Sequence, residues 1–324
     1  MKKLSTLIFI ATLILVLFGT YLVMSASSTY SEFKFENQFH LFNIHLIRAV
    51  VGILFLIIFM FIPYEIYKDF SKLLLFISIG LLVLTLLLAT EVKGARRWID
   101  LGIVNFQPVD LVKIVLFIHL AALIENKGEE IRDFKKGFIY PLIWIIITVG
   151  LIIIQPNVSN GIILFLVSLI ILWIGNAKIK HILSTFFVGG FSVLTAIMVF
   201  PHARSRFLSF IHSIQNDTEI NMQVQQAIIG LGSGGIYGVG LGNSSQRNLF
   251  LPEAYGDFIF AILGEEIGFI GSIIILLIYL LIFLFGIIIA KNSKDKFGQL
   301  LGFAISFSFV IYAFINASVA CGIL

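Results

Sequence analysis

Residues 267–290 read IGFIGSIIILLIYLLIFLFGIIIA, a run of 24 residues without a single charged side chain. A helix of that length is about 36 Å long at 1.5 Å per residue, and the hydrocarbon core of a bilayer is about 30 Å thick. The stretch therefore predicts a transmembrane helix and sets the class of the whole protein.

Apolar stretches of the same kind recur along the chain. Of its 324 residues, 59% are hydrophobic and 12% are charged, whereas a soluble domain carries about 25% charged residues. We predict spans at 4–24, 47–63, 71–90, 109–124, 137–154, 161–176, 182–200, 267–290 and 300–322. The sequence thus predicts an all-α polytopic membrane protein with about nine transmembrane helices, and residues 1–324 form a single membrane domain.

The distribution of basic residues gives the orientation and points to an outer site. With the N-terminus in the cytoplasm, twelve of the fifteen lysines but only one of the seven arginines fall in inner segments. This predicts a multi-pass protein of the cytoplasmic membrane. Arginine binds phosphate and carboxylate groups with two parallel hydrogen bonds. The outer arginines therefore suggest a site for an anionic, lipid-borne ligand, and contact with headgroups and local acids is the alternative. They are Arg48, Arg96, Arg97, Arg204, Arg206 and Arg247.

A large outer loop, residues 201–266, separates the seventh and eighth predicted spans. Its many Phe, Leu and Ile residues predict short helices packed on the outer membrane face, and we expect it to carry the active site. Seven glycines lie between 230 and 242, and three of them, Gly230, Gly232 and Gly235, formally match G-x-G-x-x-G, but no βαβ unit is possible here to bind a dinucleotide. The glycines permit close backbone approach; a flexible hinge and a plain loop both remain open.

A second outer segment joins Arg96 and Arg97 to the start of the span at 109–124. Trp98 suits the headgroup zone, and for the two arginines anion binding is favoured. In the same segment Gln107 and Pro108 mark a helix start. Asp110 lies in the first turn, where it favours the helix dipole and can form a salt bridge with Lys113 three residues later.

Three acids, Asp257, Glu265 and Glu266, stand where the outer loop meets the eighth span. A carboxylate at a bilayer boundary is costly unless it is solvated or paired, so each is a candidate functional residue. Asp257 is interpreted either as a helix N-cap or as a general base that activates a hydroxyl. Glu265 and Glu266 are expected to be solvated or paired with an outer arginine.

Five ordered motifs resemble those of the SEDS family (shape, elongation, division and sporulation), which includes RodA, FtsW and SpoVE. The motifs are Ser25–Ser27, Lys93–Leu101, Gln107–Asp110 with Lys113, Gln155–Asn157, and Leu251–Phe260 with Glu265–Gly268. The Pro252-Glu253-Ala254 form is more similar to the FtsW branch. The chain departs from the family pattern at Val109, Asp110, Asn157, Ser159, Asn160, Tyr255 and Gly256. The family has a tenth span that is not predicted here; truncation and a fold that ends with the ninth span both remain open, and either could reduce or abolish activity.

The resemblance implies a peptidoglycan glycosyltransferase that polymerises lipid II on the outer face of the membrane. Asp257 would be the general base that deprotonates the acceptor C4 hydroxyl, and the donor would lose undecaprenyl pyrophosphate with inversion. Glu253 is expected to bind substrate. Candidates to hold the pyrophosphate are Arg96, Arg97, Lys113, Arg204 and Arg206. Residues expected to support the site are Trp98, Gln107, Asp110, Glu265 and Glu266.

The implied partners are lipid II, a class B penicillin-binding protein and membrane lipids, with no nucleic acid. No cofactor or metal site is predicted, and the sequence does not decide whether a divalent cation is needed. One alternative is a lipid II flippase, which would need a polar path. Lys113 is the only ionisable residue expected well inside a span, which favours the enzyme. The other alternative is a non-catalytic scaffold that activates the penicillin-binding protein.

Overall fold

The computed structural model describes residues 2–89, 97–100, 105–199, 204–205, 208, 222–251 and 254–323. The helices in the first half are α1 (Lys2–Phe35), α2 (His40–Met60), α3 (Tyr64–Asp69), α4 (Ser71–Leu88), α5 (Pro108–Lys127) and α6 (Ile139–Ile154). Those in the second half are α7 (Val158–Ile174), α8 (Ile179–Val199), α10 (Met222–Gly234), α11 (Ile259–Lys291) and α12 (Lys296–Ala320). A short 3-10 helix (Gly128–Arg132) and a π-helix (Phe134–Phe138) join α5 to α6.

The fold class is confirmed: every predicted span coincides with a helix, and six helices are long and apolar enough to cross a membrane. The strands β1 (Ile99–Asp100) and β2 (Asn105–Phe106) form a two-residue antiparallel hairpin in which Ile99 pairs with Phe106. The number of spans remains a prediction, because helix length and composition alone do not show which helices cross the bilayer.

Three of the predicted boundaries are wrong: the end of the first span and the starts of the second and the eighth. Residues 25–35 and 40–46, expected in an outer loop, belong to α1 and α2. Helix α11 begins at Ile259, eight residues before the predicted span, so the last part of the outer loop is helical. The short helix expected within that loop is present as α10.

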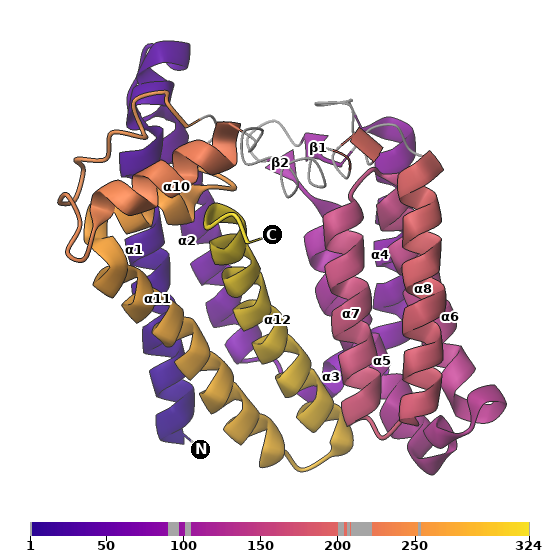
Figure 1. Ribbon diagram of the computed structural model, residues 1–324. Coiled ribbons are helices and arrows are strands. Elements are labelled where there is room, and N and C mark those ends of the chain that lie inside the picture. The colour runs from indigo at the N-terminus through magenta and orange to yellow at the C-terminus, as the bar shows by residue number, and fades with distance from the viewer. Residues whose placement is uncertain are drawn as a thin grey trace. The chain divides into compact units, whose positions relative to one another are not determined.

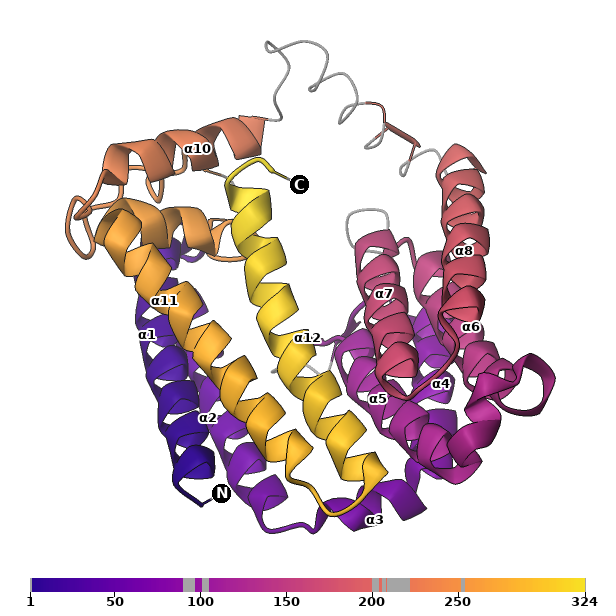
Figure 2. The same ribbon diagram turned by 60° about the horizontal axis from the view of Figure 1, so that its bottom comes forward.

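The chain forms two compact units, and their boundary runs through α11 and α12. Unit 1 comprises residues 1–61, 209–286 and 308–324. It contains α1 and α2, which pack on each other, and residues 259–286 of α11 and 308–320 of α12, with α10 lying crosswise to them (Figures 1 and 2). Unit 2 comprises residues 62–208 and 287–307. The single-domain organisation remains a prediction.

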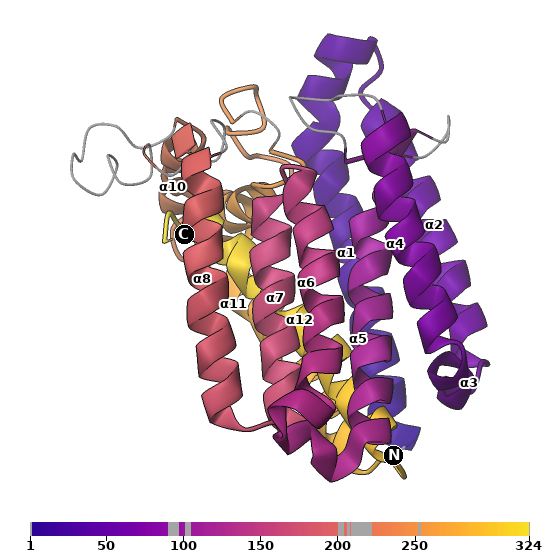
Figure 3. The ribbon, with the colours of Figure 1, turned by 90° about the vertical axis from the view of Figure 1, so that its right-hand side faces the viewer.

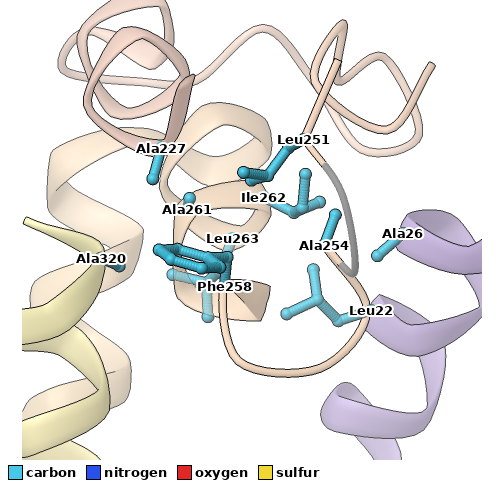
Figure 4. Packing of buried hydrophobic residues seen from close by; sticks show 10 residues of the cluster. All are labelled: Leu22, Ala26, Ala227, Leu251, Ala254, Phe258, Ala261, Ile262, Leu263 and Ala320. Carbon is cyan, nitrogen blue, oxygen red and sulfur yellow. The ribbon is translucent and has the colours of Figure 1, made fainter. Parts of the chain in front are cut away.

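Within unit 2, α4 to α8 run side by side (Figure 3). Helix α5 is its centre: it contacts α4, α6 and α7, and its buried positions lie all around it rather than on one face. Unit 1 has its own apolar core, in which Leu251, Ala254 and Phe258 pack with residues of α1, α10, α11 and α12 (Figure 4). This core lies directly beside the acids singled out from the sequence.

Candidate functional site

Asp257 lies in the turn that precedes α11, and its side chain is exposed. The turn is held from α12, where Asn316 Nδ2 donates to the backbone oxygen of Asp257 at 3.1 Å. In the part of the chain that the structure describes, no backbone N–H donates to the Asp257 carboxylate, so the helix-cap interpretation has no support there. The carboxylate is thus open to a ligand while its backbone is fixed.

Glu265 has the opposite environment, because only 1% of it is exposed. Its Oε1 accepts a hydrogen bond from the Ser245 backbone N–H at 3.0 Å. It also shares the single proton of the Ser233 hydroxyl, at 3.2 Å, with the Gly230 backbone oxygen, which is closer at 2.8 Å. Its Oε2 accepts from the Ser244 hydroxyl and, at 3.3 Å, from the Gln246 backbone N–H. Four donors from α10 and the loop after it therefore surround one carboxylate.

Glu266 is equally buried and faces α1, where the Ser25 hydroxyl donates to its Oε1. Its Oε2 is buried without a hydrogen-bond partner among the described residues. Neither Glu265 nor Glu266 is solvated, and no described arginine forms an ion pair with either, so the expectation for these two residues is wrong. Hydroxyl and amide donors take the place of water and cations.

The burial of the two glutamates also corrects a premise of the sequence analysis. Both lie inside α11, so Lys113 is not the only ionisable residue within a long apolar helix. The scarcity of buried charge therefore no longer separates an enzyme from a flippase.

Helix α11 is broken just after the glutamates, at Gly268, whose φ of 68° and ψ of −170° are not helical. The loop that follows α10 enters this break and pairs with it through backbone hydrogen bonds. They run from Val239 N to Glu265 O (3.0 Å), Gly240 N to Glu266 O (3.1 Å), Phe269 N to Gly235 O (2.9 Å) and Ile270 N to Ile236 O (3.2 Å). The polar backbone exposed by the break is thereby satisfied by the loop.

Glycine is required for this pairing. Gly238 has a φ of 84°, and a Cβ there would overlap the carbonyl oxygen of Glu266. A Cβ on Gly234 would overlap the carbonyl oxygen of Gly264. The predicted close backbone approach is confirmed, because residues 234–240 are hydrogen-bonded to and packed against α11. Whether the segment acts as a hinge stays a prediction.

The outer residues of unit 2 form a separate group. Arg97 Nε donates to the backbone oxygen of Gln155 at 3.3 Å, and its guanidinium also donates to that of Pro156. Gln155 is 1% exposed and donates from Nε2 to the Leu82 oxygen at 2.9 Å. Two motifs that were separate in the sequence thus meet, and Arg97 supports a turn; its anion-binding role stays a prediction.

The start of α5 is as predicted. Pro108 is the first helical residue, Asp110 lies in the first turn, and Lys113 Nζ is 2.9 Å from Asp110 Oδ1. The Asp110 side chain is 64% exposed and that of Lys113 12%. Gln107 directly precedes the helix, and Trp98 is 40% exposed. The salt bridge is confirmed.

The predicted site residues divide between the two units, and each group is described within its own unit. Asp257, Glu265 and Glu266 belong to unit 1, whereas unit 2 contains Arg97, Trp98, Gln107, Asp110, Lys113 and the exposed Arg204. Three predicted residues, Arg96, Arg206 and Glu253, lie outside the described residues. Within the described ranges, no group of three or more His, Cys, Asp or Glu side chains could hold a metal ion.

The sequence analysis missed Ser233, Ser244 and Asn316. Asn316 could have been noticed as a polar residue within the predicted span 300–322. The two serines gave no signal, because their significance depends on a contact with a helix about 20 to 30 residues further along the chain.

Comparison with known proteins gives a consistent result. A family model described as "Cell cycle protein", FTSW_RODA_SPOVE, matches residues 5–324. The stage V sporulation protein E of Bacillus subtilis is 31% identical over 321 residues, covering 98% of this chain and 87% of that protein. The probable peptidoglycan glycosyltransferase FtsW of Coxiella burnetii is 33% identical over 325 residues, covering 98% of this chain and 87% of the relative.

Solved structures share the fold. A chain from a study of polymerization and crosslinking by a peptidoglycan synthase complex has a TM-score of 0.75 at 22% identity, covering all of this chain and 88% of that one. The rod shape determining protein RodA of Thermus thermophilus has a TM-score of 0.67 at 21% identity, covering 98% and 84%. At this level of identity the similarity shows the fold alone.

Proposed function

The chain belongs to the family of FtsW, RodA and SpoVE, and from this premise we propose that it is a peptidoglycan glycosyltransferase. It is a multi-pass membrane protein of the RodA-like fold. Its substrate would be lipid II, taken at the outer face of the cytoplasmic membrane with the N-terminus inside. A class B penicillin-binding protein would be its partner, and the motif around Asp257 favours the FtsW branch.

One observation supports Asp257 as the general base. Of the three acids in this segment that the structure describes, Glu265 and Glu266 are buried at 1% exposure and held by the protein, whereas Asp257 is exposed. A general base must reach the proton that it removes to within about 3 Å, directly or through one water, and among these three acids only Asp257 can do so.

The reaction assigned to this base is a glycosyl transfer with inversion. Asp257 accepts the proton of the acceptor C4 hydroxyl as that oxygen forms a bond to the anomeric carbon of the donor. The bond from that carbon to undecaprenyl pyrophosphate breaks, and the pyrophosphate leaves with the electron pair. Cationic groups that stabilise this charge would lower the barrier, and the candidates are Arg96, Arg97, Lys113, Arg204 and Arg206.

The proposal is tested by adding lipid II to the purified chain in complex with its penicillin-binding partner and separating glycan strands on a gel. The expected result is polymer from the wild type and none from Asp257→Asn. Glu32→Gln, which neutralises an exposed acid near the end of α1, is the matched control and should behave as the wild type. Equal polymer from Asp257→Asn and wild type would overturn the assignment. No polymer from any variant, with the complex intact, would favour the scaffold.

A further inference from the structure

Each oxygen of the Glu265 carboxylate faces one backbone N–H: Oε1 accepts from Ser245 and Oε2 from Gln246. Serine hydroxyls add to these bonds. Ser244 donates to Oε2, and Ser233 shares its proton between Oε1 and the Gly230 oxygen. A hydroxyl can rotate, but a backbone N–H cannot turn away from its acceptor. Both oxygens must therefore be acceptors, and an amide in either orientation would set N–H against N–H.

The turn held in this way leads directly to the segment of the proposed base. From Gln246 the chain continues to Leu251, whose backbone N–H donates to the Gln246 oxygen at 3.2 Å. Leu251 is 3% exposed and packs in the core of unit 1 with Ala254 and Phe258 (Figure 4). Phe258 immediately follows Asp257, so the turn and the base are linked through the core in which Leu251 and Phe258 both pack.

The contacts of Asp257 itself show why its direction depends on how firmly the neighbouring backbone is held. Asn316 holds the backbone of Asp257 from α12, but the Asp257 side chain is exposed and gains no packing of its own. Its direction is therefore determined by the backbone on either side. A displacement of about 1 Å in a reacting group can lower a rate about 100-fold.

We propose that Glu265 is a positioning residue for Asp257. Its carboxylate fixes the turn at 244–246, which with the core around Leu251 and Phe258 sets the direction of the base. The inference rests on the function proposed above, since a positioning residue matters only if Asp257 is the base.

The test is Glu265→Gln in the full chain with its penicillin-binding partner, with lipid II as the substrate. The substitution preserves size but places an N–H against a backbone N–H. We expect kcat to fall roughly 10- to 100-fold while KM changes by less than about threefold, because the base is displaced and the binding groups are not. Hydrogen exchange should become faster in residues 244–258 and stay unchanged in α5.

Glu266→Gln is the matched control. Among the described residues Glu266 accepts one hydrogen bond, from the Ser25 hydroxyl to Oε1, so an amide can keep this contact by turning its oxygen to Ser25. Its kcat should fall by a clearly smaller factor than that of Glu265→Gln. Ser244→Ala removes one of the four donors to Glu265 and serves as a milder variant if Glu265→Gln does not fold; we expect its kcat to fall about 3- to 10-fold.

Each outcome is decisive. An unchanged kcat per folded molecule in Glu265→Gln, or in Ser244→Ala if the former does not fold, would overturn the positioning role, as would an equal loss in Glu266→Gln. A rise in KM with kcat unchanged would also overturn it, because that would make Glu265 a binding residue. If Asp257→Asn forms as much polymer as the wild type, the base assignment fails and the positioning role fails with it. If only the Glu265 result is negative, the base assignment stands.

Discussion

Glu265 in unit 1 and Asp110 in unit 2 are both acids near the beginning of a long apolar helix, but the protein uses them differently. Glu265 is 1% exposed and accepts hydrogen bonds from Ser244, Ser245 and Gln246 and, shared with the Gly230 oxygen, from Ser233, whereas the Asp110 side chain is 64% exposed and forms an ion pair with Lys113. A hydrogen bond to a charged group contributes about 1.5–3 kcal/mol when buried, and an exposed ion pair about 0–1 kcal/mol. Removing the charge of Glu265 should therefore disturb the structure around it, whereas removing the charge of Asp110 should change the free energy of unfolding only slightly.

The largest loss of stability is expected from a substitution at Gly268, the residue at which the loop after α10 pairs with α11. Its φ of 68° strains any other residue, and a Cβ there would lie 2.6 Å from the Ile236 oxygen. Gly268→Val should lower the free energy of unfolding by at least about 3 kcal/mol, because strain adds to the loss of the paired loop. The measurement is the thermal unfolding midpoint in detergent.

Gly80→Val is the control for this change. Gly80 lies within α4, and its added side chain would meet nothing within 4 Å. The control should unfold near the wild-type temperature. Similar midpoints for the two variants would contradict the view that the loop needs the break at Gly268.

An ion pair whose exposure lies between that of Glu265 and that of Asp110 extends the comparison. In unit 2, Lys68 forms an ion pair with Glu125, with side chains 33% and 19% exposed, and the Phe297 backbone N–H also donates to Glu125 at 3.3 Å. The hydrogen bond from Lys68 to Glu125 raises the pKa of the lysine. A double-mutant cycle of Lys68→Met and Glu125→Gln should give a coupling free energy of about 1 kcal/mol, between the two extremes.

The pH dependence of this cycle has a definite sign. A lysine with a raised pKa contributes its stability fully below its unfolded pKa, about 10.4, and loses it as the pH rises through the higher folded value. The coupling measured at pH 8 should therefore disappear at strongly alkaline pH. A coupling free energy of zero at pH 8 would contradict the prediction and show that Lys68 and Glu125 behave like a fully exposed ion pair.

The positions of the helices could be predicted because a long apolar run is what a segment that crosses a bilayer requires. The residues at which the helices begin and end could not be predicted in this way. Residues 25–35 looked like a loop because they are rich in Ser and Thr. In the structure Ser28 donates to its own helix at the Ser25 oxygen (3.0 Å), and Ser31 is buried and accepts from the Leu41 backbone N–H (3.1 Å). Polarity satisfied locally or by a neighbouring helix does not end a helix.

The site was predictable only in part for a related reason. Asp257 was identified from its motif and lies at an exposed turn, as a base would. The environment of Glu265 was not predictable, since its donors lie 19 to 32 residues earlier in the chain and reach it only because the loop after α10 folds back. Such contacts follow from tertiary structure, which local pattern does not contain.

The contribution of an exposed charge is tested at Asp110. Asp110→Asn removes one partner of an ion pair whose acid is 64% exposed, so the free energy of unfolding should change by less than about 1 kcal/mol. The change should shrink further at high salt, because exposed charges are screened. A loss as large as that of Gly268→Val would show that Lys113, 12% exposed, depends on this acid as a buried charge does.

The smallest effect is expected at Asp133, which caps the π-helix at residues 134–138. Its carboxylate accepts from the backbone N–H groups of Lys135 (3.0 Å) and Lys136 (2.9 Å). These bonds, that of Lys136 first, lower the pKa of Asp133 below its ordinary value of 3.8. A lowered pKa means that the carboxylate stabilises the cap above that value and ceases to do so as the pH falls through the folded pKa.

Asp133→Asn keeps an acceptor oxygen but carries no charge, so it isolates this electrostatic part. Amide exchange at Lys135 and Lys136 should be faster in the variant at pH 6, and the difference should vanish at a pH below the folded pKa of Asp133. A difference that persists there would mean that shape rather than charge holds the cap. Because this acid lies on the surface, the global unfolding midpoint should hardly change, in contrast to Glu265, where the same exchange of an oxygen for an amide disturbs a buried turn.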